Sequence, residues 1–575
     1  MRRAAAALAA ALLLLALAPA LAGAKKPGSA PPDPNALVIP PRQDRPPAGH
    51  VRSARQVLAI AARAPRIRTT LAHHRGATSA AYEKGTKRWQ VSYFAKRRDP
   101  KVQGKEIAQV TIDDRTGKVI ESWTGFQVPW SMARGYPGAF GRKVGAIYIW
   151  IPLCLLFVIP FVDPRRPFRL LHLDLLMLVG LSVSLAFFSH GKIGVSVPLA
   201  YPPLAYLLVR MLFAARSRRG PPAAIRLLVP TTWLVVGLIF LLGFRIGLNV
   251  TNSNVIDVGY AGVIGADRLT HGKTLYGTYP ADNQHGNTYG PAVYYAYVPF
   301  EQAFPWDGRW DDLPAAHGAA IFFDLLTILL LFLLGRRIRG PTLGIALAYA
   351  WAAYPFTLFA LNSNSNDSFV AALVLAAILA AAGPVRRGAL AAIAGLTKFA
   401  PLGLVPLLAT YRDPSRPARS LARTLVLFAT GFAATAAALV AWPLLHGGVR
   451  DFYEHSVRFQ AQRESPFSVW GLVGGLDTEQ HIVQGLAVLL ALVVAFVPRR
   501  RDLVTLSALA AAVSIALQLG VTHWFYLYIP WFFGLVMVAL LGRGIEPRGA
   551  AAAKSDLERG REPARSRPPA LASSR

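Results

Sequence analysis

The sequence predicts an all-α polytopic membrane protein with a small extracytoplasmic α+β domain near its N-terminus. Three observations lead to this fold class. Of the 575 residues, 53% are hydrophobic and only 16% are charged, which is too apolar for a soluble multidomain protein. Many apolar runs approach the roughly 20 residues that a helix needs to cross a bilayer. Arginines gather in short clusters between these runs, as they do in cytoplasmic loops.

This clustering also explains the net charge of +32. Because the arginines are divided among short loops between apolar runs, they indicate membrane topology, and we expect no nucleic-acid partner. The single cysteine, Cys154, lies inside an apolar run. One cysteine excludes intrachain disulfides and cysteine-based metal sites.

The first 24 residues predict a secretory signal peptide. Arg2 and Arg3 precede an Ala/Leu core, and small residues follow up to Ala24, as in a signal sequence. The alternative is an uncleaved anchor with the same orientation, and both place the following segment outside. Residues 25–50 are rich in proline and are predicted to form a flexible linker.

Residues 51–143 are predicted to form a small α+β domain outside the membrane. Val51–Ala64 suits a helix, whereas the alternation of Trp89, Val91 and Tyr93 predicts a strand. The segment QVTIDDRTGKVIES, residues 109–122, has the form of a hairpin and resembles the PepSY domain. Since no catalytic cluster occurs here, we expect a binding or regulatory module.

The remaining chain predicts about 11 transmembrane helices. Residues 144–224 hold additional membrane helices, 225–541 a transmembrane core and 542–575 a disordered cytoplasmic tail. From an outside N-terminus, arginine clusters fall in the predicted inner loops, whereas the outer loop 247–314 carries seven acids and three Lys/Arg. The predicted spans lie near 144–162, 168–188, 192–214, 225–246, 315–335, 341–361, 367–383, 421–444, 481–498, 503–520 and 523–541.

One apolar segment does not fit this alternation. Residues 388–410 could cross the membrane once, but the arginines before and after them both favour the cytoplasm. A re-entrant hairpin, broken around Lys398–Pro401, resolves the conflict. Such a break is tolerated where protein or a polar cavity surrounds it.

The predicted topology brings three polar segments to the outer face, namely Asn254–Phe300, Asn362–Asp367 and 446–480. His523 begins the last span on the same side, and Lys398 can reach that side from the hairpin. Carboxylates that meet cations at a membrane surface suit the transfer of a sugar from a lipid phosphate. The donor cannot leave the bilayer, so its phosphate must be bound at the interface.

Several of these segments resemble GT-C glycosyltransferases, and the nearest group is the polyprenyl-phosphate-sugar-dependent glycosyltransferase family 87. DVGYAGVIGADRLTHGKTLYG is similar to the first outer loop of the superfamily, through Asp257, Tyr260, Gly272, Leu275 and Tyr276. YGPAVYYAYVPF, SNSNDSFVAALVLAAIL, GLTKFAPLGLVPLL and HWFYLYIP resemble later segments in the same order. The resemblance spans 225–541. It departs from the family because three spans and a PepSY-like module precede it.

The resemblance implies an inverting membrane hexosyltransferase. A hexose such as mannose would pass from a polyprenyl-phosphate donor to an extracytoplasmic lipid or cell-envelope glycan. Asp257 would be the general base that takes the acceptor proton. The alternative is that Asp257 only caps a helix beginning near Val258.

Other residues of the polar segments are candidates for substrate binding. Asp267 could instead pair with Arg268 on the surface, and Asn366 and Asp367 could cap the next helix. Asp282, beside Asn283, could orient acceptor hydroxyls or belong to a plain turn. The candidate substrate-binding residues are Tyr260, Asp267, Asp282, Tyr289, Asn366 and Asp367.

Cations on the same side are candidates for the donor phosphate. An ammonium inside an apolar run is costly unless it is paired or solvated, which favours a function for Lys398 over snorkelling. Arginines in the loop 446–480 could clamp a phosphate, or remain solvated. The candidate phosphate-binding residues are Lys398, Arg458, Arg463 and His523.

No metal-binding spacing occurs, and we expect neither a metal nor another cofactor. The predicted location is the plasma membrane, with the N-terminal domain and the active site extracytoplasmic and the C-terminal tail cytoplasmic. Two other functions compete. A transporter or lipid flippase also uses broken helices, but the polar residues here gather at one face. A sensor with the PepSY-like module as its working part would need only one anchor.

Overall fold

The computed structural model describes residues 37–85, 87–96, 104–136, 138–216, 225–310, 313–414, 420–498 and 501–544. The signal peptide predicted for 1–24, the first part of the linker predicted for 25–50 and nearly all of the tail predicted for 542–575 lie outside these residues.

An antiparallel five-stranded sheet forms the N-terminal domain, in the order β1-β2-β3-β4-β5. The strands are β1 (Leu37–Val38), β2 (Thr78–Lys84), β3 (Arg88–Phe94), β4 (Glu106–Asp113) and β5 (Val119–Thr124). Two helices, α2 (Ala54–Arg63) and α3 (Pro65–His73), supply Val57, Ala61 and Ile67 to the core of this domain.

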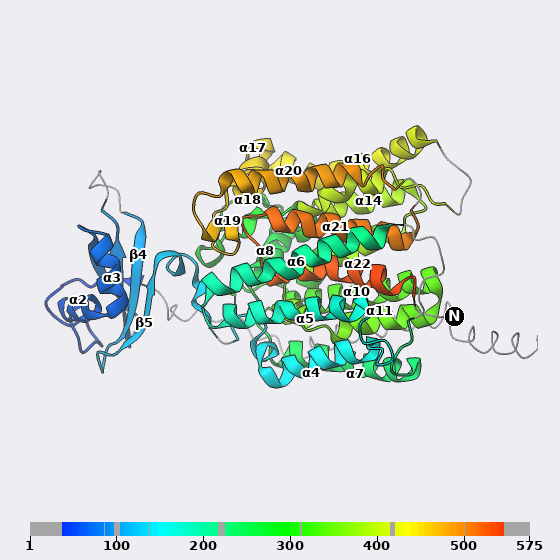
Figure 1. The fold of residues 1–575 in the computed structure, drawn as a ribbon. Coiled ribbons are helices and arrows are strands. Elements are labelled where there is room, and N and C mark those ends of the chain that lie inside the picture. Colours follow the sequence, from blue (N-terminus) through cyan, green and yellow to red (C-terminus); the bar gives the residue numbers. More distant parts are fainter. Residues whose placement is uncertain are drawn as a thin grey trace, which may run out of the picture.

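The predicted strand alternation is confirmed in β3. Trp89, Val91 and Tyr93 point to the same face and are buried in the domain core, because successive side chains of a strand alternate between faces. The predicted helix is α2, which begins at a capping box formed by Ser53 and Gln56. The sheet lies between its two helices and the helical bundle, beyond the end of the bundle that holds α8, α18 and α19 (Figure 1).

The bundle contains all the remaining helices. Its first helices are α4 (Ile147–Val158), α5 (Leu170–Ser189), α6 (Ile193–Ala215), α7 (Thr231–Thr251), α8 (Asp257–Thr270) and α9 (Pro291–Ala303). The middle ones are α10 (Pro314–Arg339), α11 (Pro341–Ala353), α12 (Pro355–Asn362), α13 (Asp367–Leu379), α14 (Pro384–Gly395), α15 (Val405–Ala409) and α16 (Leu421–His446). The last ones are α17 (Gly448–Phe452), α18 (Phe459–Gln462), α19 (Val469–Leu472), α20 (Asp477–Val493), α21 (Leu503–Gly520) and α22 (Ile529–Leu541). Short 3₁₀ or π turns join several of them, including η3 (Ser131–Arg134), η4 (Arg142–Gly145), η5 (Ile159–Phe161), η8 (Ala400–Leu404), the π-helical turn η9 (Tyr453–Arg458) and η10 (Tyr526–Tyr528).

Among the described residues, six helices are long and apolar enough to cross a membrane: α5, α6, α7, α10, α16 and α21. The pair α11 and α12, bent by 59° at Tyr354, would make a seventh. Three further predicted spans correspond to shorter apolar helices, at Ile147–Phe161, Asp367–Leu379 and Tyr526–Leu541. The span predicted near 481–498 corresponds to α20, which has 17 residues. A mostly helical membrane protein is therefore confirmed, whereas the count of eleven spans stays a prediction.

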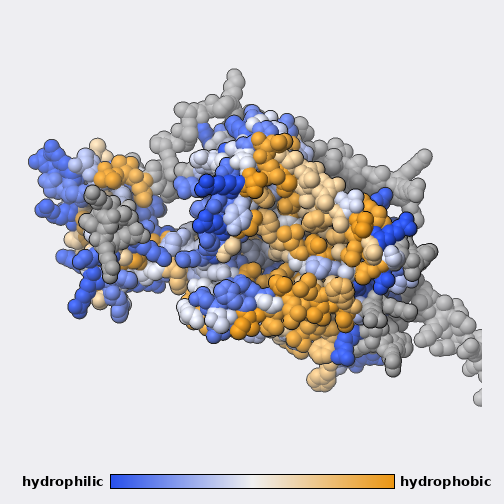
Figure 2. All heavy atoms as spheres, turned by 90° about the horizontal axis from the view of Figure 1, so that it is seen from above, coloured by the Kyte–Doolittle hydropathy of each residue, from blue (hydrophilic) through white to orange (hydrophobic). Residues whose placement is uncertain are grey.

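The surface of the bundle matches this interpretation. Hydrophobic side chains cover its middle, and hydrophilic ones gather toward both ends (Figure 2). One end holds the arginines in the last turn of α10, where Arg337 donates to the carbonyl of Leu379 and Arg339 to that of Arg543. Arg543 in turn donates to the carbonyl of Arg216, at 3.4 Å. The C-terminal ends of α6, α10, α13 and α22 thus meet at one arginine-rich end of the bundle.

The segment predicted as a re-entrant hairpin is broken where expected. Helix α14 ends at Gly395 and η8 begins at Ala400, with Lys398 between them. The chain then returns, because the guanidinium of Arg387, near the start of α14, donates to the carbonyl of Tyr411 at 3.1 Å. The two ends of the segment therefore lie together, and Lys398 lies at the break.

Candidate active site

Backbone pairing between two distant segments holds Asp257 in place. The amide of Asn254 donates to the carbonyl of Asn362 (3.1 Å), and that of Ile256 to the carbonyl of Ser363 (3.2 Å). Gly259 allows this close approach, since a Cβ there would lie 2.2 Å from the carbonyl oxygen of Asn364. The first turn of α8 therefore lies beside the residues that precede α13.

Asp257 is the first residue of α8, after the extended residue Ile256. The helix thus begins one residue earlier than the capping alternative assumed, and Asp257 lies in its first turn. Asn283 donates to the backbone carbonyl of Asp257 at 3.0 Å. Its carboxylate accepts a backbone hydrogen bond from Val258.

Protein surrounds the solvent-accessible carboxyl of Asp257. The residue is accessible to solvent, yet desolvation by the protein around it raises its pKa, against the opposing charges of Arg463 and Lys398. Water therefore reaches the carboxylate, while the surrounding protein disfavours its charged form.

Asp367 and Lys398 form a buried ion pair close enough for both charges to act on Asp257. Lys398 Nζ lies 2.5 Å from Asp367 Oδ1, and their side chains are 11% and 1% exposed. Trp531, on α22, donates its indole N–H to the same oxygen at 2.9 Å. Helix α13, the break after α14 and helix α22 therefore meet at one carboxylate.

Aromatic rings surround the ammonium of Lys398. Its Nζ lies 5.2 Å from the ring centre of Trp531, 5.5 Å from that of Tyr528 and 6.0 Å from that of Tyr289. Cation–π attraction stabilises an ammonium in such surroundings. One hydrogen of the ammonium points to Asp367, and two remain for a further anion.

His523 belongs to the same cluster, close enough for the charges of Arg463 and Lys398 to act on it. Its Nδ1 lies 2.9 Å from Ser465 Oγ, which accepts the amide hydrogen of Phe467 and is free to donate its own. Its Nε2 would then carry the proton. Burial lowers the pKa of His523, and Arg463 and Lys398 lower it further, so this imidazole is neutral at neutral pH.

Arg463 interacts with both Asp257 and His523. Its charge acts on both Asp257 and His523, and its guanidinium lies 5.6 Å from the ring centre of Trp130. Trp130 also stacks on His523, with ring centres 5.7 Å apart. The segment that follows the N-terminal sheet thus supplies a ring to the cluster.

Several buried polar atoms near Asp367 have no hydrogen-bond partner among the described residues. They are Asp367 Oδ2, both amide atoms of Asn366 and the hydroxyls of Ser368 and Tyr297. Buried polar atoms are normally paired. Unpaired donors and acceptors next to an ion pair are therefore places where a polar ligand or water can bind.

Four other candidates make their main side-chain contacts outside this cluster. Asp267 pairs with His271 at 3.0 Å, almost three helical turns, or about 15 Å, beyond Asp257. Arg458 is half-exposed and pairs with Glu454 at 2.8 Å. Tyr260 is buried and stacks on Trp310, and the charge of the exposed Asp282 acts on its hydroxyl.

Four residues of the cluster were not predicted from the sequence. Tyr528 and Trp531 lie in or directly after HWFYLYIP, so their position in this segment was a usable signal. Trp130 and Ser465 carry no local signal, because nothing in their neighbourhoods indicates which distant residues they meet. Among the described residues, no group of three or more His, Cys, Asp or Glu side chains is arranged so that it could hold a metal ion.

One comparison with known proteins found a family match that covers most of the residues of this cluster. Residues 287–523 match the sequence model of glycosyltransferase family 87, a GT-C type membrane glycosyltransferase family. The match contains Tyr289, Asp367, Lys398, Arg463 and His523, whereas Asp257 precedes it. A search of curated proteins found no match. The PepSY resemblance of 51–143 stays a prediction.

Proposed function

We propose the following reaction, because residues 287–523 match a family of membrane glycosyltransferases. The protein transfers a hexose, such as mannose, from a polyprenyl-phosphate donor to a hydroxyl of an extracytoplasmic lipid or cell-envelope glycan, with inversion. One observation carries the proposal. Asp257, Lys398, Arg463 and His523 come from four separate segments and meet at one end of the bundle.

Asp257 is the general base. Its carboxylate takes the proton of the acceptor hydroxyl as that oxygen attacks the anomeric carbon, and the bond between this carbon and the phosphate oxygen breaks. A raised pKa makes the carboxylate a stronger base, because proton transfer is most effective when the pKa approaches the working pH. The polyprenyl phosphate leaves with the bonding electrons.

Lys398 and Arg463 bind the phosphate of the donor and the negative charge that develops on it. Preorganised charges of this kind stabilise a leaving group without reorganisation of solvent. His523, held by Ser465, adds a neutral N–H donor. Asn366 and Tyr289 are placed to bind sugar hydroxyls, since both amide atoms of Asn366 are unpaired among the described residues and the ring of Tyr289 adjoins Lys398.

Two features favour a lipid-linked donor and an extracytoplasmic site. Helix α16 is largely exposed along its apolar length, so it offers lipid-facing surface next to the loops that carry Arg463. The arginine-rich end of the bundle lies opposite the cluster, and arginines favour the cytoplasmic side. We therefore place the cluster at the outer face of the plasma membrane and the C-terminus inside.

The test is sugar transfer in proteoliposomes that contain a polyprenyl-phosphate hexose and an acceptor extract. Asp257→Asn should lower the transfer rate about 10²- to 10⁴-fold, the usual contribution of a general base. Asp477→Asn is the matched control, because Asp477 is also the first residue of a helix, α20, and is exposed. If the two variants turn over at the same rate, Asp257 is not the base.

A further inference from the structure

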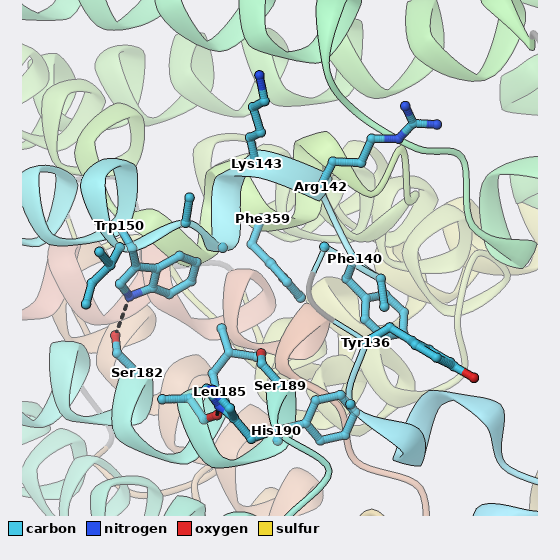
Figure 3. Close-up of a pocket in the computed structure, with 18 of the residues that line it drawn as sticks. Tyr136, Phe140, Arg142, Lys143, Trp150, Ser182, Leu185, Ser189, His190 and Phe359 are labelled. Carbon is cyan, nitrogen blue, oxygen red and sulfur yellow. Dashed lines mark hydrogen bonds between the residues drawn. The ribbon is translucent and has the colours of Figure 1, made fainter. Parts of the chain in front are cut away.

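A cavity of about 850 Å³ lies outside the candidate active site. Its walls come from residues 132–136 and 138–151, the second half of α5, Asn252 directly after α7 and Phe359 on α12. In Figure 3 the rings of Phe140, Trp150 and Phe359 face Leu185 and Ser189 across this space. Apart from Phe359, the lining precedes the part of the chain that matches family 87.

The lining suits a hydrocarbon chain. Some of its few polar side chains already have hydrogen-bond partners in the wall. Trp150 donates to Ser182 Oγ at 2.9 Å, and His190 Nδ1 lies 2.7 Å from the carbonyl of Ala186. A large cavity lined mainly by apolar side chains binds an apolar ligand more readily than it binds water.

The cavity opens toward the lipid-facing surface. Ile147, Ile151 and Val183 belong to its lining and are 76%, 49% and 53% exposed. Because they lie on α4 and α5, on the apolar part of the bundle, their exposed sides face the hydrocarbon of the membrane. A lipid chain can therefore enter sideways without crossing a polar surface.

The mouth of the cavity is cationic. Arg142 and Lys143 are exposed and extend away from the apolar rings (Figure 3), and no Asp or Glu occurs among the described residues that line the cavity. Arg142 has a φ of 49°, a left-handed conformation that is unfavourable for a residue with a side chain. Both cations lie at the outer ends of the helices, where lipid headgroups lie.

One layer of aromatic rings separates this cavity from the candidate active site. Phe140 and Phe188 line the cavity, and Phe188 contacts Phe467 with ring centres 5.6 Å apart. Phe467 in turn lies 5.8 Å from His523. A ligand in the cavity would therefore contact Phe188, which packs through Phe467 against His523, one of the residues that we propose to bind the donor phosphate.

We propose that this cavity binds the hydrocarbon chain of an anionic membrane lipid, with its phosphate at Arg142 and Lys143. The chain enters between α4 and α5 and fills the space bounded by Phe140, Trp150 and Phe359. A glycerophospholipid and a polyprenyl phosphate share this chemistry. The proposal does not depend on the proposed transfer reaction, because it concerns binding alone.

Photolabelling of the full-length protein in bilayers tests the proposal. The probes are phosphatidylglycerol, phosphatidylcholine and a polyprenyl phosphate, each with a diazirine in its chain. An anionic probe should label peptides from 132–151 and 182–190 at least 10-fold more than phosphatidylcholine does. Displacement by unlabelled phosphatidylglycerol or unlabelled polyprenyl phosphate then identifies the source of the chain.

Two glycines provide matched variants. Neither Gly145, in the cavity lining, nor Gly180, on α5 outside it, has a left-handed φ, and a Cβ at either would meet no atom within 4 Å. Gly145→Trp should reduce the labelling at least 10-fold, whereas Gly180→Trp should leave it unchanged. The double variant Arg142→Gln/Lys143→Gln should remove the preference for anionic probes.

Two results would overturn the proposal. One is equal labelling of this wall by phosphatidylcholine and by the anionic probes in the unmodified protein, a measurement that needs no variant to fold. The other is labelling that persists unchanged in Gly145→Trp when its elution from size-exclusion chromatography equals that of Gly180→Trp.

Discussion

At the residue scale, Lys398 shows what a charged side chain requires inside an apolar segment. From the sequence, the lysine could either reach the headgroups or bind a partner. In the structure it pairs with Asp367 and is surrounded by aromatic rings. The apolar context predicted that Lys398 is special. Its partner could not be predicted, because Asp367 lies on another helix and also suited a capping role.

The role of Lys398 can be separated from its contribution to folding. Lys398→Ala leaves Asp367 buried without its cation, which would destabilise the fold as well as donor binding. Lys398→Met/Asp367→Asn removes both charges and should restore stability. If Lys398 binds the donor phosphate, both variants should raise the KM for the donor about 10- to 100-fold, the value of a hydrogen bond to a charged group.

The measurements are the initial rate against donor concentration and the thermal unfolding midpoint. A double variant that regains both stability and the original donor KM would show that the ion pair is only structural.

The pH dependence of transfer tests Asp257 against His523. Because burial raises the pKa of Asp257, its carboxylate becomes protonated at a higher pH than an ordinary aspartate. A protonated carboxyl cannot accept the acceptor proton, so kcat/KM should fall as the pH is lowered through this raised pKa. His523 should contribute less to this fall than an ordinary histidine would, since burial and the charges of Arg463 and Lys398 lower its pKa.

The variant His523→Gln should therefore keep the acidic limb of the profile with a lower rate, whereas Asp257→Glu should shift the limb. Disappearance of the acidic limb in His523→Gln would assign the titration to the histidine and contradict the role of Asp257.

At the scale of elements, the connection between the sheet and α4 reaches into the candidate site. Residues 125–146 follow β5, and within them Trp130 contacts His523, Arg463 and Phe467. The sequence predicted the sheet, the hairpin turn and the break at Lys398, because each depends on neighbouring residues. The contact between Trp130 and His523 depends on the packing of the whole bundle, so no local pattern could predict it.

Trp130 should therefore position Arg463 and His523 for the donor phosphate. Trp130→Ala should raise the donor KM about 2- to 30-fold, corresponding to the 0.5–2 kcal/mol of a cation–π contact, with a smaller effect on kcat. Trp130→Phe retains a ring and should recover part of the loss. The control is Trp233→Ala on α7, where the ring is 67% exposed.

KM for the donor and kcat are measured separately in the three variants, at equal amounts of folded protein. Equal losses in Trp130→Phe and Trp130→Ala, confined to kcat, would exclude a positioning role for the ring.

At the scale of the whole molecule, the arginine clusters predicted which helix ends meet, but the length of apolar runs did not predict the number of long spans. Helices α13 and α22 have 13 residues each, and nearly all their side chains are buried by other helices. A helix surrounded by protein does not need the 20 apolar residues required of one that faces lipid over its whole length. Apolar composition therefore identified these helices without defining their extent.

A buried ion pair joins three helices of the bundle. Arg245 on α7 contacts Asp324 on α10 at 2.6 Å, with both side chains 1% exposed. Trp351 on α11 donates to Asp324 at 2.8 Å, and Arg245 also donates to the carbonyl of Ala352 at 3.1 Å. Charged residues within membrane helices are costly unless they are paired in this way.

Removing one partner of this pair should be more harmful than removing both. Asp324→Leu leaves a guanidinium that cannot lose its proton, so it should destabilise the bundle by about 3–5 kcal/mol. Arg245→Met should cost less, because an isolated carboxyl can become neutral by protonation. The double variant Arg245→Met/Asp324→Leu should recover most of the loss, since apolar side chains can replace a buried pair.

Denaturant unfolding in detergent measures these differences in stability. The control is Glu454→Gln, which removes the carboxylate of the exposed Arg458 pair and should change the free energy of unfolding by no more than about 0.5 kcal/mol. A double variant no more stable than Asp324→Leu would show that the packing around the pair, and not the unpaired charge, determines the stability of the bundle.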